Sequence, residues 1–341
     1  MADAAARTPA GTPSERARAL SDAARSGDRR ALARLLTAVE NRTAVAEHAL
    51  RQLYPLAGGA HLIGITGPPG AGKSTLVAAL IAAYRAAGRT VAVVAVDPSS
   101  PITGGALLGD RVRMQSYAAD DGVFIRSMAS RGHAGGLAST STAAAAVLDA
   151  AGFEVVLLET VGTGQSEVEV AATADTTVVL EAPEMGDEVQ AIKAGLLEVA
   201  DLVVVNKGDR PGAQRAAAQL RAMLVPGVVR GDGDSARPAP KRPEVLVTTA
   251  TSGEGIPELV VALDRHRAGL VDREGGRAAA RRLRAEAQVR AVLVERLWDR
   301  LHGAPRAAAT AAVIAAVAAH DIDPYDAADR LLAALPEEDR A

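Results

Sequence analysis

The chain contains no cysteine, and aromatic residues make up only 2% of it. The first absence excludes disulfides, thiolate metal sites and cysteine nucleophiles. The second leaves few rings on which the bases of a single-stranded nucleic acid could stack. The chain also lacks an excess of positive charge, with 38 basic against 41 acidic residues and a net charge of −3. A general nucleic-acid or anionic-membrane binder shows a basic excess, so neither is expected as a partner.

Long apolar runs are also missing. The longest weakly apolar run, residues 307–319, has 13 residues, most of them alanine. A membrane-spanning helix needs about 20 strongly apolar residues, so this run is expected to be a packed helix. The first sixteen residues hold no apolar core of signal-peptide length. We therefore expect a cytoplasmic protein with no membrane partner.

Short apolar runs alternate with helix-length segments from His61 onward. This alternation predicts a doubly wound α/β fold with a mostly parallel sheet, because several runs are apolar throughout, as strands buried on both faces are. The expected strands are residues 62–66, 91–96, 123–127, 154–159, 176–181, 202–206 and 244–249. The expected helices between and after them are residues 74–87, 136–151, 187–199, 213–224 and 256–269.

The organisation along the chain predicts four segments. Residues 1–13 are expected to be a disordered tail, and residues 14–58 a helical extension in which Asp28 caps one helix. The α/β domain should cover residues 59–271, with a surface insertion rich in glycine and proline at 226–243. Residues 272–341 are expected to be helical, with prolines between the helices.

A phosphate-binding loop is the clearest motif. Residues 67–74, GPPGAGKS, match G-x-x-x-x-G-K-[ST] at every fixed position, between an expected strand and an expected helix. The glycines let backbone N–H groups face phosphate, Lys73 would neutralise the β- and γ-phosphates, and the Ser74 hydroxyl would bind Mg²⁺. The expected nucleotide contacts in this loop are Gly67, Pro69, Gly70, Ala71, Gly72, Lys73, Ser74 and Thr75.

Two further motifs stand where the expected strands end. Glu159 and Gly162 form an E-x-x-G variant of Asp-x-x-Gly, in which the carboxylate approaches Mg²⁺ and the glycine N–H faces the γ-phosphate. Asn206, Lys207 and Asp209 resemble the N-K-x-D guanine motif of GTPases. A carboxylate at Asp209 can accept from the guanine N1–H and N2–H₂ groups, which adenine does not present in that arrangement.

The residues after the last expected strand complete the base site. The segment 248–251, TTAT, stands where GTPases place a backbone N–H that contacts the guanine oxygen. Thr249 and Ala250 are the expected contacts. The sequence therefore predicts a site for GTP or GDP with Mg²⁺.

Longer strings of residues around and between these motifs resemble one particular GTPase family. They are GDRRALARLLTAVEN (27–41), VAVDPSSPITGGALLGDRVRM (94–114), FIRSMASRGHAGGLA (124–138), ETVGTGQSEVEV (159–170) and EMGDEVQAIKAG (184–195). With the two nucleotide motifs, the chain resembles the methylmalonyl-CoA mutase-associated GTPases over residues 27–301. These are G-protein chaperones of adenosylcobalamin enzymes, labelled arginine/ornithine-transport kinases in older naming.

The resemblance implies a function and partners. It implies a GTPase that gates delivery of adenosylcobalamin to an acyl-CoA mutase and protects or reactivates that mutase. It further implies a homodimer formed through the C-terminal helical region, and a cobalamin adenosyltransferase as a further partner.

The resemblance also assigns residues to three switches. Asp97 and Asp110 fall in the first and are the implied Mg²⁺-side carboxylates, beside Ser74 and Glu159. Gln165 falls in the second with Glu159 and Gly162, and Lys193 falls in the third, which is thought to relay the nucleotide state to the mutase. The implied catalytic residues are Lys73, Glu159, Gln165 and Lys193.

One departure from small GTPases affects the expected rate. Thr163 follows the switch glycine where small GTPases carry their water-orienting glutamine. Intrinsic hydrolysis is therefore expected to be slow and to depend on another residue or on a partner.

Three other functions remain open at this point. One is a GTPase that inserts nickel into an enzyme, although such proteins usually carry Cys/His metal sites and this chain has no cysteine. Another is a kinase linked to amino-acid transport, and the third is a scaffold that binds GTP without hydrolysing it.

Overall fold

The computed structural model describes residues 11–98, 117, 119–130, 136–160, 173–183, 197, 199–224, 243–272, 276–303 and 306–335. The chain divides into two compact units, Met1–Ala285 and Glu286–Ala341. Helix α11 (Gly276–His302) crosses the boundary between them.

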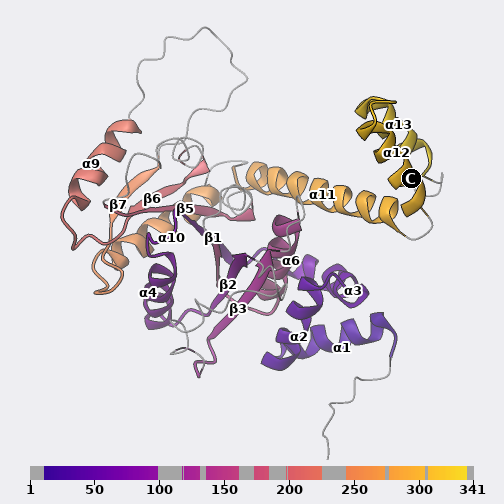
Figure 1. The fold of residues 1–341 in the computed structure, drawn as a ribbon. Helices are drawn as coiled ribbons and strands as arrows, with labels where there is room; N and C mark the ends of the chain where they lie inside the picture. Colours follow the sequence, from indigo (N-terminus) through magenta and orange to yellow (C-terminus); the bar gives the residue numbers. More distant parts are fainter. Residues whose placement is uncertain are drawn as a thin grey trace, which may run out of the picture. The chain divides into compact units, whose positions relative to one another are not determined.

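The first unit is built on a seven-stranded parallel sheet with the order β3-β2-β4-β1-β5-β6-β7 (Figure 1). Every strand pair is parallel, which confirms the predicted doubly wound fold. The central strand β1 has β4 on one side and β5 on the other, so the chain changes direction across the sheet at β1. The strands are β1 (His61–Thr66), β2 (Val91–Pro98), β3 (Val123–Ser130), β4 (Val155–Thr160), β5 (Thr176–Glu181), β6 (Leu202–Val205) and β7 (Glu244–Val247).

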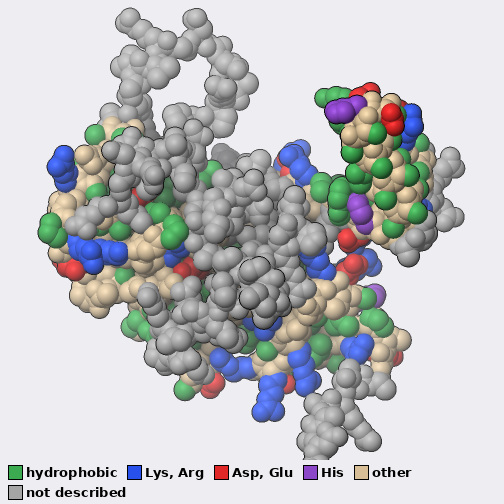
Figure 2. Space-filling view, viewed as in Figure 1, with side chains coloured by type: hydrophobic (Ala, Val, Ile, Leu, Met, Phe, Trp, Pro, Cys, Tyr) green, Lys and Arg blue, Asp and Glu red, His purple; other side chains and the backbone are tan. Residues whose placement is uncertain are grey.

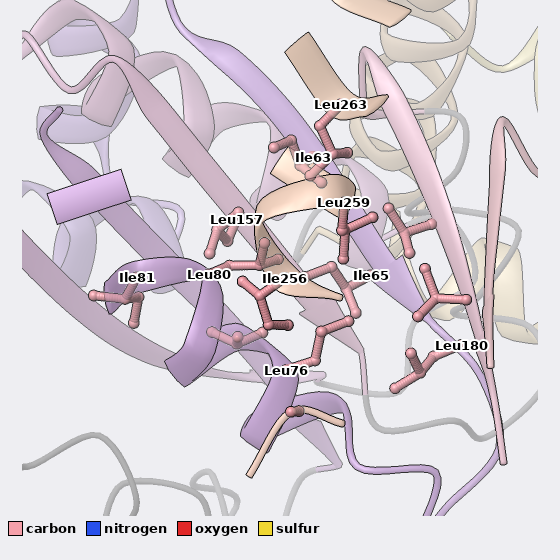
Figure 3. Close-up of a cluster of buried hydrophobic side chains, with 14 of the residues drawn as sticks. Ile63, Ile65, Leu76, Leu80, Ile81, Leu157, Leu180, Ile256, Leu259 and Leu263 are labelled. Carbon is pink, nitrogen blue, oxygen red and sulfur yellow. The ribbon is translucent and has the colours of Figure 1, made fainter. Parts of the chain in front are cut away.

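Helices α4 (Lys73–Ala86) and α10 (Ile256–Asp272) cover one face of the sheet. Figure 3 shows Leu76 and Leu80 of α4, with Leu259 and Leu263 of α10, directed at side chains of the central strands. These four leucines are fully buried. Successive side chains of the inner strands point to opposite faces of the sheet. Because they are apolar on both faces, each face buries a hydrophobic core.

The other face carries α6 (Gly136–Ala150), α9 (Ala213–Met223) and the N-terminal helices. The N-terminal helices are α1 (Pro13–Arg25), α2 (Arg29–Glu40) and α3 (Ala44–Leu53), followed by the 3₁₀ turn η1 (Tyr54–Leu56). Thr12, Asp28 and Thr43 cap them, each side chain accepting from backbone N–H groups of the first turn. The cap predicted at Asp28 is confirmed.

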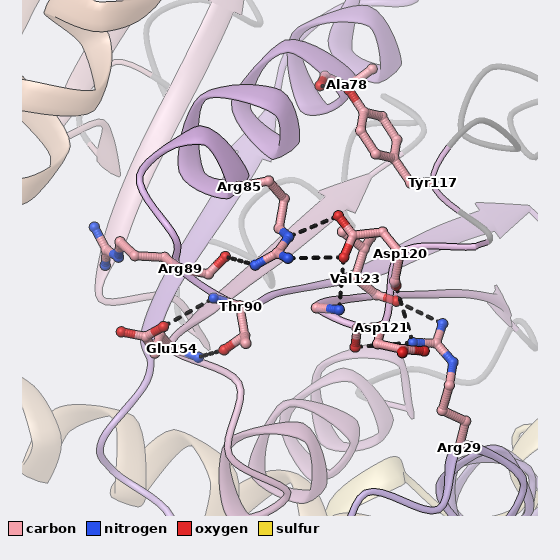
Figure 4. Close-up of polar contacts among 11 residues, drawn as sticks. Arg29, Ala78, Arg85, Arg89, Thr90, Tyr117, Asp120, Asp121, Val123 and Glu154 are labelled. Atoms are coloured by element: carbon pink, nitrogen blue, oxygen red, sulfur yellow. Dashed lines mark hydrogen bonds and ion pairs between the residues drawn. The ribbon is translucent and has the colours of Figure 1, made fainter.

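Two arginines attach the N-terminal helices and α4 to the turn before β3 (Figure 4). Arg29 of α2 donates to the carbonyls of Asp120, Asp121 and Val123 at 3.3, 3.2 and 2.7 Å. Arg85 of α4 forms a two-bond ion pair with the carboxylate of Asp120, at 2.9 Å for both bonds. The same turn is therefore held from both faces of the sheet.

The second unit is helical. After α11 come α12 (Ala307–Ala318) and α13 (Pro324–Ala333), which begins after an Asp323 cap. The Thr310 hydroxyl is buried and donates to the Leu301 carbonyl at 2.7 Å, joining α12 to α11 within this unit. Hydrophobic side chains lie at the surface of this unit (Figure 2).

No single helix among the described residues is long and apolar enough to cross a membrane. One pair, residues 288–302 with 307–318, reaches the length and composition together but is bent by 100°.

Candidate nucleotide site

The candidate site lies at the carboxyl ends of the parallel strands, beside the central strand β1. Residues 67–72 connect the end of β1 to the first residue of α4, as the sequence predicts. In open α/β sheets, ligands bind at this edge, where the strand order changes direction. The loop also directs the N-terminus of a 14-residue helix at the site, which favours a bound anion.

Two glycines of the loop are required by their surroundings. Gly67 has φ +143°, and a Cβ there would lie 2.1 Å from the Leu180 carbonyl oxygen. Gly72 has φ +96°, and a Cβ would lie 2.5 Å from Nδ2 of Asn206. Both combine a backbone conformation that other residues rarely adopt with a close approach that a side chain would block. The motif's glycines are therefore explained by contacts with β5 and with the residue after β6.

Lys73 is buried against its own loop. Its ammonium donates to the carbonyl oxygens of Gly67 and Pro68 at 2.7 and 3.1 Å. The side chain is only 7% exposed, so its positive charge is held inside the curve of the loop. An ammonium in that place is suited to neutralise phosphate oxygens bound by the loop's N–H groups.

Ser74 and Glu159 provide a pair of oxygen donors next to the loop. The Ser74 hydroxyl donates to Oε1 of Glu159 at 2.7 Å, and both side chains are buried. Glu159 comes from β4, the strand beside β1, so the pairing depends on the sheet register. A hydroxyl and a carboxylate are hard oxygen ligands of the kind that Mg²⁺ prefers, so these residues fit the ion that the sequence predicts.

The other predicted metal and switch residues are less fully described. The backbone of Asp97 lies near the end of β2, directly after Val96, which pairs with Thr160 of β4. Its residue position is therefore at the same sheet edge as Glu159. Asp110, Gly162, Gln165 and Lys193 lie outside the described residues, as does Thr163.

Asn206 joins three loops of the site. Its Nδ2 donates to the Ala71 carbonyl of the phosphate loop at 3.0 Å. Its Oδ1 accepts from the Thr248 hydroxyl at 3.2 Å and from the Ala250 amide at 3.1 Å. The side chain is 2% exposed. The two motifs, more than 130 positions apart in the sequence, are thus connected by one buried carboxamide.

A cavity of about 170 Å³ opens beside this junction. It is lined by Gly72, Thr75, Asn206, Lys207, Asp209, Arg210, Ala250 and Thr251. The structure therefore brings the P-loop, the N-K-x-D turn and the last loop together around one space. Lys207 adopts a left-handed conformation with φ +59°, a strained geometry that is enriched at functional sites.

The loop after β7 directs its backbone donors to different partners. The amide of Thr249 donates to the Glu254 carbonyl at 2.9 Å, and the amide of Ala250 donates to Asn206. Thr249 does not line the cavity, whereas Thr251 does. Within the described part of the chain, the Thr251 amide donates to no backbone carbonyl, whereas those of Thr249 and Ala250 already have partners.

Sequence reasoning did not select Thr251 or Arg210. The string TTAT contains four candidate amides, and the sequence does not distinguish them. In the structure, those of Thr248, Thr249 and Ala250 donate to Val205, Glu254 and Asn206. Arg210 directly follows Asp209, and its adjacency to the motif was the available signal.

The fold and this edge of the sheet define a P-loop GTPase. Comparison with known proteins then identifies the family: residues 32–306 match the methylmalonyl-CoA mutase-associated GTPase MeaB family, to which the chain belongs.

Individual relatives agree with that assignment. A Pyrococcus abyssi protein named as a GTPase is 46% identical over 90% of this chain and 93% of its own length. The mitochondrial methylmalonic aciduria type A homologue of Mus musculus is 40% identical over 58% of this chain and 46% of its own length. The crystal structure of an LAO/AO transport system kinase superposes with a TM-score of 0.66 at 28% identity, covering 96% of this chain and 98% of the other.

Proposed function

We propose that this GTPase hydrolyses GTP with Mg²⁺ and serves as a G-protein chaperone for an adenosylcobalamin-dependent acyl-CoA mutase of the methylmalonyl-CoA mutase type. It would gate cofactor delivery and protect or reactivate the mutase. The proposal of GTP binding rests chiefly on Asn206, whose side-chain hydrogen bonds join the phosphate loop to the loop after β7 beside one cavity. The family of the chain, associated by name with methylmalonyl-CoA mutase, supports the client.

The phosphate loop suggests how the triphosphate of GTP would be bound. N–H groups of residues 67–75 and the N-terminus of α4 would bind the phosphate oxygens, with Lys73 neutralising the β- and γ-phosphates. Ser74 and Glu159 would hold Mg²⁺ together with Asp97 and Asp110, and the bound ion would offset charge developing on the transferred phosphoryl group. Gly162, Gln165 and Lys193 are proposed to respond to the γ-phosphate, with Gln165 or Lys193 assisting hydrolysis.

In the base site, one group would read the donors of guanine and another its carbonyl oxygen. Asp209 would accept from N1–H and N2–H₂, and a backbone N–H of the 249–251 segment would donate to the guanine oxygen. Asp209→Asn exchanges an acceptor for a donor, so the preference should move from GTP toward xanthosine triphosphate. Competition binding of the two nucleotides measures this preference. A variant that still prefers GTP by the wild-type ratio would contradict Asp209 as the base reader.

The client is tested with a purified methylmalonyl-CoA mutase. The proposal expects binding that depends on the nucleotide, and GTP turnover that rises from a slow intrinsic rate when the mutase is added. Lys73→Ala serves as the control, because a mutase effect that persists in it cannot act through the nucleotide. A mutase that neither binds nor changes turnover rejects the client.

The alternatives give different results in the same assays. A kinase would transfer labelled γ-phosphate to a protein or amino-acid acceptor, as the name of the structural relative suggests. A nickel metallochaperone would change GTP turnover on binding Ni²⁺, and a scaffold would show no single-turnover hydrolysis with or without partner. Each of these outcomes would replace the proposed function.

Two assembly features complete the proposal. A homodimer formed through the C-terminal helices is supported by exposed hydrophobic side chains on the second unit, among them Leu293 and Trp298, 61% and 54% exposed. A cobalamin adenosyltransferase is proposed as a further partner, which would supply the cofactor to be delivered.

A further inference from the structure

The cavity of about 170 Å³ beside Asn206, called the base cavity from here on, is lined mainly by polar and charged side chains. None of the described residues that line it is aromatic, so no ring there can stack on a nucleotide base. Two of its lining residues, Lys207 and Arg210, are cationic instead. Both belong to the tight turn that also presents Asp209.

That turn is held rigidly by backbone bonds. The Arg210 amide donates to the Lys207 carbonyl at 2.9 Å, and the Gly208 amide donates to the Thr248 carbonyl at 2.9 Å. Gly208 lies so close to β7 that a Cβ there would come 2.9 Å from Cγ1 of Val247. Helix α9 begins three residues after Arg210, at Ala213. The position from which the Arg210 side chain starts is therefore fixed relative to Asp209 and the cavity.

We propose that the guanidinium of Arg210 covers one face of the nucleotide base, a role that an aromatic ring fills in other nucleotide sites. This deepens the proposed function, since it concerns the same GTP site. A planar guanidinium stacks on aromatic faces and attracts them by cation–π interaction. The apolar stem of Lys207, which also lines the cavity, can cover another part of the base.

A contact with the face of the base and a contact with its edge should affect nucleotide selectivity differently. Asp209 reads hydrogen-bonding groups on the edge of the base, so its replacement changes which base is preferred. A stacked guanidinium depends on the ring system, which every purine shares. Removing it should weaken all purine nucleotides by one common factor and leave their ranking unchanged.

The test compares Arg210→Ala with Arg215→Ala. Arg215 is an exposed arginine on the first turns of α9 that does not line the cavity, so its loss changes the net charge equally. Dissociation constants for GTP, GDP, inosine triphosphate and inorganic tripolyphosphate are measured by calorimetry at one ionic strength. Arg210→Ala should weaken the three nucleotides by about two- to fivefold and leave tripolyphosphate unchanged, with Arg215→Ala like wild type.

Other results overturn the inference. Equal weakening of tripolyphosphate would mean that Arg210 acts on phosphate through its charge, and unchanged nucleotide affinity would mean that it does not contact the base. Arg210→Lys keeps the charge without the planar group and should also weaken nucleotide binding, so full rescue by lysine argues against stacking.

Failure of the Arg210 inference can be distinguished from failure of the proposed GTP-binding function. A wild-type protein that binds ATP as tightly as GTP would refute guanine selectivity at Asp209. Arg210 would then be judged by the same comparison of ATP with tripolyphosphate, because stacking requires only a purine face.

Discussion

The Lys73 side chain makes its contacts within the phosphate loop and not within the hydrophobic core. Its ammonium donates to the carbonyls of Gly67 and Pro68, within its own loop. The neighbouring core beneath α4 is built from Leu76, Leu80 and residues of other elements. We therefore expect phosphate affinity and core stability to depend on different side chains.

Replacing Lys73 by alanine should abolish GTP binding or turnover while the protein stays folded. The variant removes the charge that would neutralise the β- and γ-phosphates and leaves the hydrophobic core unchanged. Fluorescent-nucleotide titration measures the binding, and circular dichroism checks the fold. Wild-type turnover in a folded variant would contradict the phosphate site.

A histidine, His61, is buried at the amino end of β1. His61 shares the Thr176 hydroxyl with His266 of α10, through Nε2 and Nδ1 contacts of 2.8 Å each. Nε2 of His266 in turn lies 3.5 Å from Asp201. Burial lowers the pKa of His61 from 6.5 to about 4, so the native protein holds this imidazole neutral.

Acid should therefore destabilise the protein through His61. The unfolded chain binds a proton near pH 6.5 and the native chain only near pH 4, so this contribution is complete above pH 6.5 and is lost as the pH falls toward 4. At pH 5 the loss should be about 2 kcal/mol of unfolding free energy.

Denaturant unfolding of wild type and His61→Gln at pH 7.5 and 5.0 measures this loss. The free-energy difference between the two pH values should be smaller in His61→Gln than in wild type. His48→Gln, on α3, is the control and should keep the wild-type difference. Equal pH dependence in all three proteins would show that His61 does not set acid stability.

At the scale of elements, the N-terminal helices are part of the core of the first unit. Leu35 and Leu36 of α2 are fully buried in a cluster that includes Leu148 of α6 and Leu158 of β4. Arg29 adds three backbone bonds from the same helix to the turn before β3, and its guanidinium lies 5.5 Å from the centre of the Phe124 ring. Helix α2 should therefore unfold together with the sheet.

Leu36→Ala should lower the free energy of unfolding by about 2 to 5 kcal/mol, because the cavity it leaves lies inside this cluster. Chemical denaturation measures the loss. Leu56→Ala is the matched control, since Leu56 is 50% exposed and its removal should cost less than about 0.5 kcal/mol. A small and equal loss in both variants would mean that α2 is not part of the cooperative unit.

Across the whole molecule, most of the large hydrophobic side chains that are exposed among the described residues belong to the second unit. Val289, Val292, Leu293, Val294 and Trp298 of α11 are 42% to 61% exposed, and Ile314 of α12 is 48% exposed. Large apolar surfaces of this kind mark association sites. They support the proposed homodimer, in which the second unit would be the contact between copies.

Light scattering on the intact chain tests this assembly. The wild type should have twice the monomer mass, and Leu293→Asp with Trp298→Asp should reduce it to the monomer, because a buried unpaired charge is costly at an interface. Val261→Asp on α10 is the control: Val261 is also 61% exposed but belongs to the first unit, so the dimer should persist. A monomeric wild type would contradict the proposal.

The order of the strands along the chain, the parallel α/β fold, the phosphate loop and the guanine motif can all be predicted from the amino-acid sequence alone. All seven predicted strands appear within a few residues of their predicted bounds, because apolar runs between turn residues encode buried parallel strands directly. The phosphate loop could be read because its chemistry is contiguous: one short segment supplies the glycines, the lysine and the serine. Such local patterns need no knowledge of the rest of the chain.

Contacts between residues that are distant in the sequence, in contrast, could be identified only from the folded structure. The sheet register brings Glu159 of β4 to Ser74, and the bond from Asn206 to Ala250 leaves Thr251 facing the base cavity beside Arg210. The same holds for Thr176 between His61 and His266. These hydrogen bonds join residues at least 44 positions apart, and no periodicity specifies them, because they arise from packing helices and loops against strands whose neighbours in space are not their neighbours in sequence.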